Sequence, residues 1–165
     1  MAAKQHAGAP PRAPESAGRY YEDFAVGDVY AHWPGRTISE TDNTWFTLLT
    51  MNTHPLHFDA HYAADSEFGK PLVNSCLTLS MVVGMSVADL SRNAVANLGW
   101  DKVKLTAPVF AGDTIYATSQ VLAKRESASR PNQGIVTART TGTKADGTEF
   151  IHFERAFLVP KRGRA

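Results

Sequence analysis

Hydrophobic and polar positions divide the chain into two parts with different periods. Between about residues 39 and 90, apolar residues recur at helical spacing. Past Asn97 they alternate with polar residues in short runs, which is typical of half-buried strands. The pattern predicts strands at Val103–Leu105, Thr114–Leu122, Ile135–Thr143 and Thr148–Val159, with Asp146-Gly147 as a hairpin turn between the last two. Helices followed by a run of antiparallel strands indicate an α+β fold.

The first predicted helix begins at Ser39. Asp42 follows three residues later, and this spacing resembles a capped helix start with an acidic first turn. The helix should end near Asn52, because Pro55 disfavours helical geometry at His54. A loop rich in histidine follows.

The second predicted helix runs from Ser75 to Leu90, and apolar residues cover nearly all of its faces. Such coverage predicts a helix surrounded by protein, with Gly84 allowing close approach to a neighbouring backbone. In that setting Cys76 would behave as a small hydrophobic residue. One long buried helix wrapped by a curved antiparallel sheet describes a hotdog domain.

Composition limits the classes of function. The 165 residues carry 17 Lys and Arg against 16 Asp and Glu, so no net field attracts nucleic acid or an anionic membrane. The uncharged stretch Pro71–Ala88 contains Pro, Asn, Ser and Thr, which favours a buried helix over a membrane span. A single cysteine excludes an internal disulfide framework and favours a reducing, cytoplasmic setting.

The same pattern predicts one domain, over residues 19–160. Residues 1–18 contain three prolines and no large aliphatic or aromatic residue, so we expect a disordered N-terminal tail. Residues 161–165 form a short basic C-terminal tail.

The densest group of reactive side chains lies in the loop after the first helix. The segment resembles the signature of the MaoC-like dehydratase family, which includes the (R)-specific enoyl-CoA hydratases. Four residues match that signature and two depart from it: the matches are Pro55, Leu56, His57 and Asp59, whereas Asn52 stands at the family's catalytic Asp and His54 at its Asn. The residue pattern of the loop is most similar to that of the mesaconyl- and itaconyl-CoA hydratases.

The resemblance extends over residues 20–160. Tyr21–Asp28 looks like the family's opening strand, Phe68–Ser75 like its lead into the buried helix, and Pro108–Thr114 like its Pro-Val-x-x-Gly-Asp-Thr turn. The resemblance implies an acyl-CoA hydratase or dehydratase that interconverts 2-enoyl-CoA and 3-hydroxyacyl-CoA. Its acyl group would be short and branched or dicarboxylic, with coenzyme A as part of the substrate and no separate cofactor.

Such a reaction needs a base, a proton donor to the adjacent carbon, and donors for the developing enolate oxygen. Histidine is the side chain best suited to accept and return a proton near neutral pH, so His57 suits the base. Asn52 can orient the water but cannot exchange a proton with it. The family's oxyanion donor is a backbone amide that carries over to Ser75 or Cys76, and Asp59 and His54 would support the site.

Other interpretations stay open at this point. Asp59 also suits the cap of a short segment beginning at Ala60. A metal site from His54, His57, Asp59 and His61 is disfavoured, because Pro55 restricts the loop and no distal ligand cluster exists. Two other functions compete: an acyl-CoA thioesterase, and a non-catalytic acyl-CoA-binding protein in which Asn52 marks lost activity. An uncovered sheet edge predicts a homodimer or a dimer-based homo-oligomer.

Overall fold

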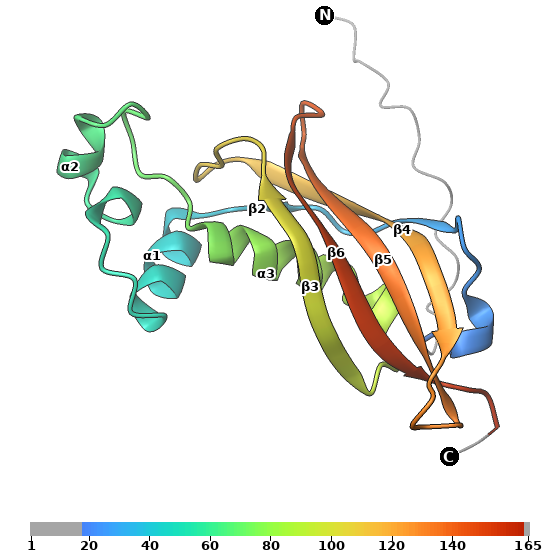
Figure 1. Cartoon of the computed structure of the whole chain (residues 1–165). Coiled ribbons are helices and arrows are strands. Elements are labelled where there is room, and N and C mark those ends of the chain that lie inside the picture. Colours follow the sequence, from blue (N-terminus) through green and yellow to red (C-terminus); the bar gives the residue numbers. More distant parts are fainter. Residues whose placement is uncertain (1–17, 164–165) are drawn as a thin grey trace, which may run out of the picture.

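The computed structural model describes residues 18–163. Its main feature is one antiparallel sheet in the order β1-β4-β5-β6-β3, with the short strand β2 also paired to β4. Figure 1 shows the helix α3 lying along this sheet, with α1 and α2 beyond its end. The elements are η1 (Tyr21–Asp23), β1 (Val29–Ala31), β2 (Arg36–Thr37), α1 (Glu40–Leu49), η2 (Pro55–His57), α2 (Ala60–Ala64), α3 (Ser75–Met85), η3 (Val87–Ser91), β3 (Ala96–Leu105), β4 (Thr114–Glu126), β5 (Gln133–Lys144) and β6 (Glu149–Pro160).

The predicted strands and the hairpin are confirmed. β5 and β6 pair along nearly their whole length. The turn between them places Gly147 at φ 89°, a left-handed conformation that glycine adopts without strain, and Thr148 N–H donates to Asp146 Oδ1. β3, β4 and β5 are longer than the pattern predicted, β3 most of all, whereas β6 has the predicted length and is shifted by one residue.

The sheet and α3 enclose two groups of buried side chains. One lies along α3 and includes Val82, Phe150 and Phe153. The other lies toward η1 and includes Phe24, Leu90 and Phe157. Alternate residues of β4 and β6 supply much of this core, as period-two patterning requires.

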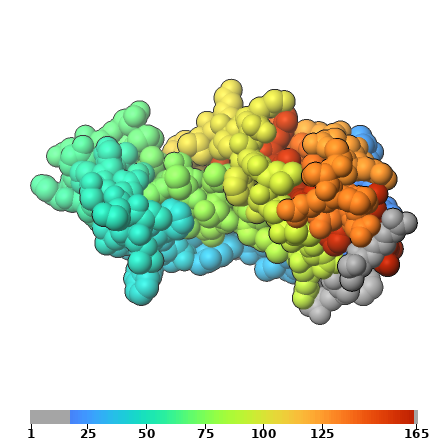
Figure 2. All heavy atoms as spheres, turned by 60° about the horizontal axis from the view of Figure 1, so that its bottom comes forward, coloured from blue at the N-terminus to red at the C-terminus, as the bar shows by residue number. Residues whose placement is uncertain are grey.

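The predicted start of α1 is also confirmed. Ser39 Oγ accepts from Asp42 N–H, and Asp42 Oδ2 accepts from Ser39 N–H, which closes a capping box. The helix ends at Leu49, three residues before the predicted end. Figure 2 shows α1, α2 and the loops beside them, coloured cyan to green, as a lobe at one end of the molecule.

The second helix departs from its prediction in length and in burial. It ends at Met85, and a π-helical turn carries the chain on to Ser91. Only Leu77, Thr78 and Val82 are buried along α3, because the sheet covers one face of the helix and leaves the opposite face open. The prediction of burial on every face is therefore wrong for the single chain. On the open face Cys76 is exposed, and among residues 18–163 no atom outside the helix's own nearby backbone and the two adjacent residues lies within 4 Å of where a side chain at Gly84 would begin.

The predicted opening strand over Tyr21–Asp28 is wrong. Residues 21–23 form a 3-10 turn, which the Asp23 carboxylate stabilises by accepting from Tyr20 N–H. Asp28 Oδ2 accepts from Ala25 N–H in the next turn, backbone hydrogen bonds to β4 begin at Gly27, and the strand β1 itself starts at Val29. Short aspartate side chains bound to nearby backbone favour turns over strands.

The tail predicted over residues 1–18 lies, apart from Gly18, outside the described residues, as do the last two residues of the predicted basic end. Among residues 18–163, no helix has both the length and the apolarity needed to cross a bilayer.

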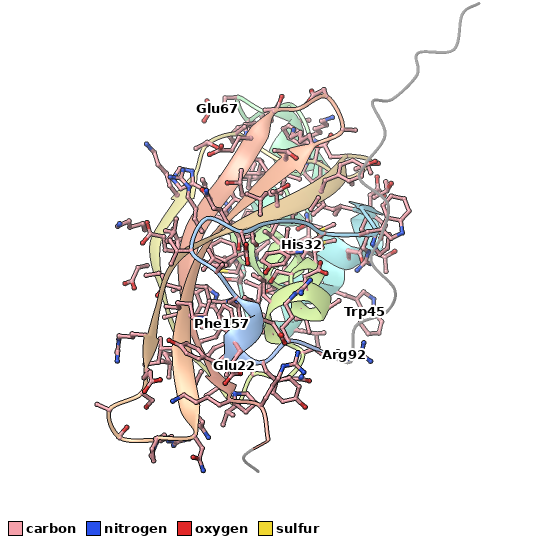
Figure 3. All side chains as sticks on the ribbon, turned by 90° about the vertical axis from the view of Figure 1, so that its right-hand side faces the viewer. Glu22, His32, Trp45, Glu67, Arg92 and Phe157 are labelled. Atoms are coloured by element: carbon pink, nitrogen blue, oxygen red, sulfur yellow. The ribbon has the colours of Figure 1, made fainter. Side chains whose placement is uncertain are left out.

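Buried polar side chains link the C-terminal end of α3 to the sheet. His32 Nδ1 lies 2.8 Å from Asp89 Oδ2, His32 Nε2 lies 2.7 Å from Ser119 Oγ, and Figure 3 shows His32 inside the molecule near this end of the helix. His32 and Ser119 are 4% and 0% exposed, so this Ser-His-Asp chain is closed to a substrate. It connects the turn after α3 to β4 and has a structural role.

Arg155 lies at the same end of α3 and is 1% exposed. Its Nη2 donates to Ser86 Oγ and Ser91 Oγ, and burial lowers the pKa of the guanidinium to about 10. A cation near the last turn of α3 is favourably placed for the helix dipole.

Burial of His32 lowers its pKa below the ordinary value of 6.5. The unfolded chain therefore binds a proton at this residue more readily than the folded chain, and stability falls as the pH drops below about 6.5. We expect the free energy of unfolding, measured by urea titration between about pH 8 and pH 5, to fall less steeply in His32→Gln than in wild type. Equal slopes in the two proteins would show that His32 does not titrate in this way.

Candidate active site

The candidate catalytic histidine is held by the backbone of a distant segment. His57 ends the 3-10 turn η2, and its Nδ1 lies 2.9 Å from the carbonyl oxygen of Leu72. A carbonyl only accepts hydrogen bonds, so Nδ1 carries the proton and the neutral ring keeps an unprotonated Nε2. A histidine in this tautomer is prepared to accept a proton at Nε2.

Asn43, buried in α1, joins the loop of His57 to the segment that leads into α3. Its Nδ2 donates to the carbonyl oxygens of His57 (2.7 Å) and Leu72 (3.1 Å). Its Oδ1 accepts from Asn74 N–H at 2.8 Å. One side chain 3% exposed thus fixes the positions of the histidine loop and the helix start relative to each other.

The first residues of α3 provide a free backbone donor. Asn74 caps the helix, and its Oδ1 accepts from Cys76 N–H at 2.9 Å. Within residues 18–163, no hydrogen bond engages Ser75 N–H. Of the two oxyanion candidates, Ser75 therefore has the available amide at the positive end of the helix dipole.

An apolar cavity of about 310 Å³ opens beside Ser75. Leu72, whose carbonyl binds His57, also lines it, so the cavity adjoins both halves of the site. No charged residue lines it; the walls include Phe68, Thr78, Leu105, Val109 and Phe150.

The remaining candidates make contacts within the loop. Asp59 caps α2 by accepting from Tyr62 N–H at 3.0 Å, as the capping interpretation predicts. Asn52 Oδ1 accepts from His54 N–H, and His54 Nδ1 accepts from Leu56 N–H. The rings of His54 and His57 lie 5.9 Å apart between centroids.

His61 projects from α2 and is exposed. No group of three or more His, Cys, Asp or Glu residues suited to a metal ion occurs in residues 18–163.

Sequence reasoning missed Asn43 and Leu72. Asn43 lies in a helix whose exposed face carries Trp45, visible at the edge of the molecule in Figure 3, and nothing in its neighbours marks it as buried. Leu72 acts through its carbonyl, which side-chain patterns do not reveal.

A family model described as mesaconyl-CoA hydratase matches residues 11–165. The chain is 33% identical to the mesaconyl-CoA hydratase of Cereibacter sphaeroides, over 91% of this chain and 43% of that protein. It is 31% identical to the (R)-specific enoyl-CoA hydratase of Rhodospirillum rubrum, over 87% of this chain and 94% of that protein. The chain thus spans about two fifths of the longer relative and matches nearly the whole of the shorter one.

The fold is similar to that of a conserved hypothetical protein from Mycobacterium tuberculosis with a double hotdog fold. The TM-score is 0.81 at 22% identity, over 90% of this chain and 46% of that one. This match confirms the predicted hotdog architecture, and the two sequence relatives confirm the resemblance to the hydratase family.

Removing the Asn43 side chain should weaken the site and the fold together. In Asn43→Ala the amide of Asn74 and the two carbonyls lose a partner, and each buried unsatisfied group costs about 1–3 kcal/mol. We expect urea unfolding to show a loss of at least this size, whereas Thr41→Ala, exposed on the same helix, should change stability little. A stability of Asn43→Ala equal to that of Thr41→Ala would contradict the joining role of Asn43.

Proposed function

Because the chain belongs to the mesaconyl-CoA hydratase family, we propose that it is an acyl-CoA hydratase that adds water reversibly to a 2-enoyl-CoA thioester. The observation that carries the proposal is the hydrogen bond from His57 Nδ1 to the Leu72 carbonyl. It leaves a basic Nε2 on a histidine whose loop is tied, through Asn43, to the start of α3. The (R)-specific hydratase matched over 94% of its length supports this activity for a chain of this size.

The reaction requires two proton transfers and one carbon–oxygen bond. His57 Nε2 takes a proton from water while the water oxygen bonds to C3 of the enoyl group. Electrons move to the thioester oxygen, which Ser75 N–H stabilises as an enolate. The imidazolium of His57 then returns its proton to C2, and the product is a 3-hydroxyacyl-CoA. Asn52 takes part in orienting the water through the loop that its Oδ1 holds at His54 N–H, since its amide cannot exchange protons near neutral pH.

The size and lining of the cavity beside Ser75 favour a substrate with a short acyl group. Its uncharged lining accepts a methyl branch, and a second carboxylate would lie outside it, because burying an unpaired charge there is costly. Short branched and dicarboxylic enoyl thioesters, such as mesaconyl-CoA and itaconyl-CoA, are therefore the substrates to compare.

The rival thioesterase function lacks support on the helix. Hydrolysis by a hotdog protein would need a carboxylate aimed into the site from α3, and Ser75–Met85 contains no Asp or Glu. The nearest carboxylate along the chain after α3, that of Asp89, is bound to His32.

The proposed assembly is a homodimer. β3 is an edge strand of ten residues, which pairs with β6 alone among the described strands, and it exposes Leu98, Trp100, Val103 and Leu105. A long exposed apolar edge and the open face of α3 both favour association with another copy. The match to one half of a double hotdog protein supports an assembly of two such domains.

His57→Ala should abolish hydration and leave the fold intact, because the ring acts on the proton transfer and lies outside the two core groups. We expect turnover of crotonyl-CoA, mesaconyl-CoA or itaconyl-CoA to fall about a hundred- to ten-thousand-fold. Loss of the enoyl double bond and release of free thiol are measured in parallel. Thiol release without loss of the double bond would establish a thioesterase, and a wild type inactive on every ester would favour the non-catalytic alternative.

Charges on the β3 edge should dissociate the dimer. Leu98→Glu together with Val103→Glu places carboxylates on the apolar edge, whereas Leu122→Glu changes an exposed residue of the interior strand β4. Analytical ultracentrifugation should give a dimer for wild type and for Leu122→Glu, and a monomer for the edge variant. A monomeric wild type would refute the proposed assembly.

A further inference from the structure

The two histidines of the loop have opposite tautomers on neighbouring rings. We propose that His54, through its Nε2–H, holds the attacking water against the unprotonated Nε2 of His57. This inference rests on the proposed hydratase function and specifies how the water is oriented. His54 is one of the two positions at which the loop departs from the MaoC-like signature.

The tautomer of His54 follows from one backbone contact. Leu56 N–H donates to His54 Nδ1 at 3.1 Å, so Nδ1 is an acceptor and the proton of the neutral ring is on Nε2. His57 is the reverse case, since its Nδ1 donates to a carbonyl. His54 thus presents a donor, and His57 presents an acceptor.

The rings are close enough to share one water. Their centroids lie 5.9 Å apart, with an interplanar angle of 58°. The Nε2 atoms of two rings this close can both reach one water oxygen at ordinary hydrogen-bond lengths of about 2.8–3.0 Å each. A water there accepts from His54 and donates to His57, which leaves its second lone pair for attack on C3.

His54 is itself held on both sides. Asn52 Oδ1 accepts from His54 N–H at 3.0 Å, and the ring of Tyr62 meets the imidazole nearly edge-on, with centroids 6.1 Å apart. Asn52 therefore acts as a positioning residue, because its carbonyl fixes the backbone from which His54 projects. The amide of Asn52, which stands in place of the family's Asp, accepts the hydrogen bond from His54 N–H and neither gains nor loses a proton.

Two substitutions separate the water-holding role of His54 from its turn-forming role. His54→Asn keeps a side-chain acceptor near the position of Nδ1 for Leu56 N–H and removes the Nε2 donor. His54→Gln lacks the short acceptor but carries an amide donor near the position of Nε2. His61→Asn is the matched control, because it makes the same substitution at an exposed histidine of α2.

Steady-state hydration of crotonyl-CoA by the full chain supplies the test. We expect kcat of His54→Asn to fall about ten- to a hundred-fold with little change in KM, His54→Gln to retain more kcat than His54→Asn, and His61→Asn to match wild type. Asn52→Ala should lower kcat too, and adding it to His54→Asn should cause no further loss, because Asn52 acts through His54.

If His54→Asn is as active as His61→Asn in an enzyme whose wild type hydrates the ester, the proposal for His54 is overturned and the hydratase function stands. Multiplying losses in the Asn52→Ala, His54→Asn double variant would overturn the positioning role of Asn52. A wild type that hydrates none of the esters would instead refute the proposed function on which this inference depends.

Discussion

The site depends on one hydrogen bond between segments fifteen residues apart, from His57 Nδ1 to the Leu72 carbonyl. It selects the tautomer of the candidate base and fixes the plane of its ring. Leu72 N–H also donates to the Leu56 carbonyl, so Leu72 is bound to the histidine loop through both of its backbone groups. Asn43 extends this pairing to Asn74 and hence to the start of α3. The candidate general base and the free amide of Ser75 are thereby linked by hydrogen bonds of backbone groups and of one buried amide side chain.

The uncovered face of α3 connects the site to the proposed assembly. The helix begins at the oxyanion candidate Ser75, and its open face carries Cys76 and Gly84. A second copy that covers this face would exclude water from around the acyl group, which strengthens the hydrogen bonds that stabilise the enolate. The apolar character on all sides of α3 is then explained by two different partners: its own sheet on one face and the second copy on the other.

Local signals in the sequence predicted much of the fold. The capping box at Ser39 and the Asp146-Gly147 turn each depend on neighbouring residues, so both could be recognised in the sequence alone. Burial around α3 depends on which elements pack against it, and apolar composition does not distinguish its own sheet from a partner chain. The opening segment forms turns because the carboxylates of Asp23 and Asp28 accept hydrogen bonds from nearby backbone amides. The apolar residues of this segment suggested a strand and gave no sign of these side-chain contacts.

The candidate site was predictable in its residue types and less so in its connections. His57 and the amide at Ser75 follow from motif and helix position, whereas Asn43 and the tautomers of His54 and His57 require the positions of backbone groups. The cytoplasmic setting expected from the single cysteine stays a prediction.

Long-range proton–nitrogen NMR correlation of the protein labelled with 15N-histidine reports the tautomer of His57. We expect His57 at neutral pH to be the tautomer protonated at Nδ1, with an Nε2 that carries only its lone pair. A His57 ring protonated at Nε2 would contradict it, since the nitrogen assigned to take the proton from water would already hold one.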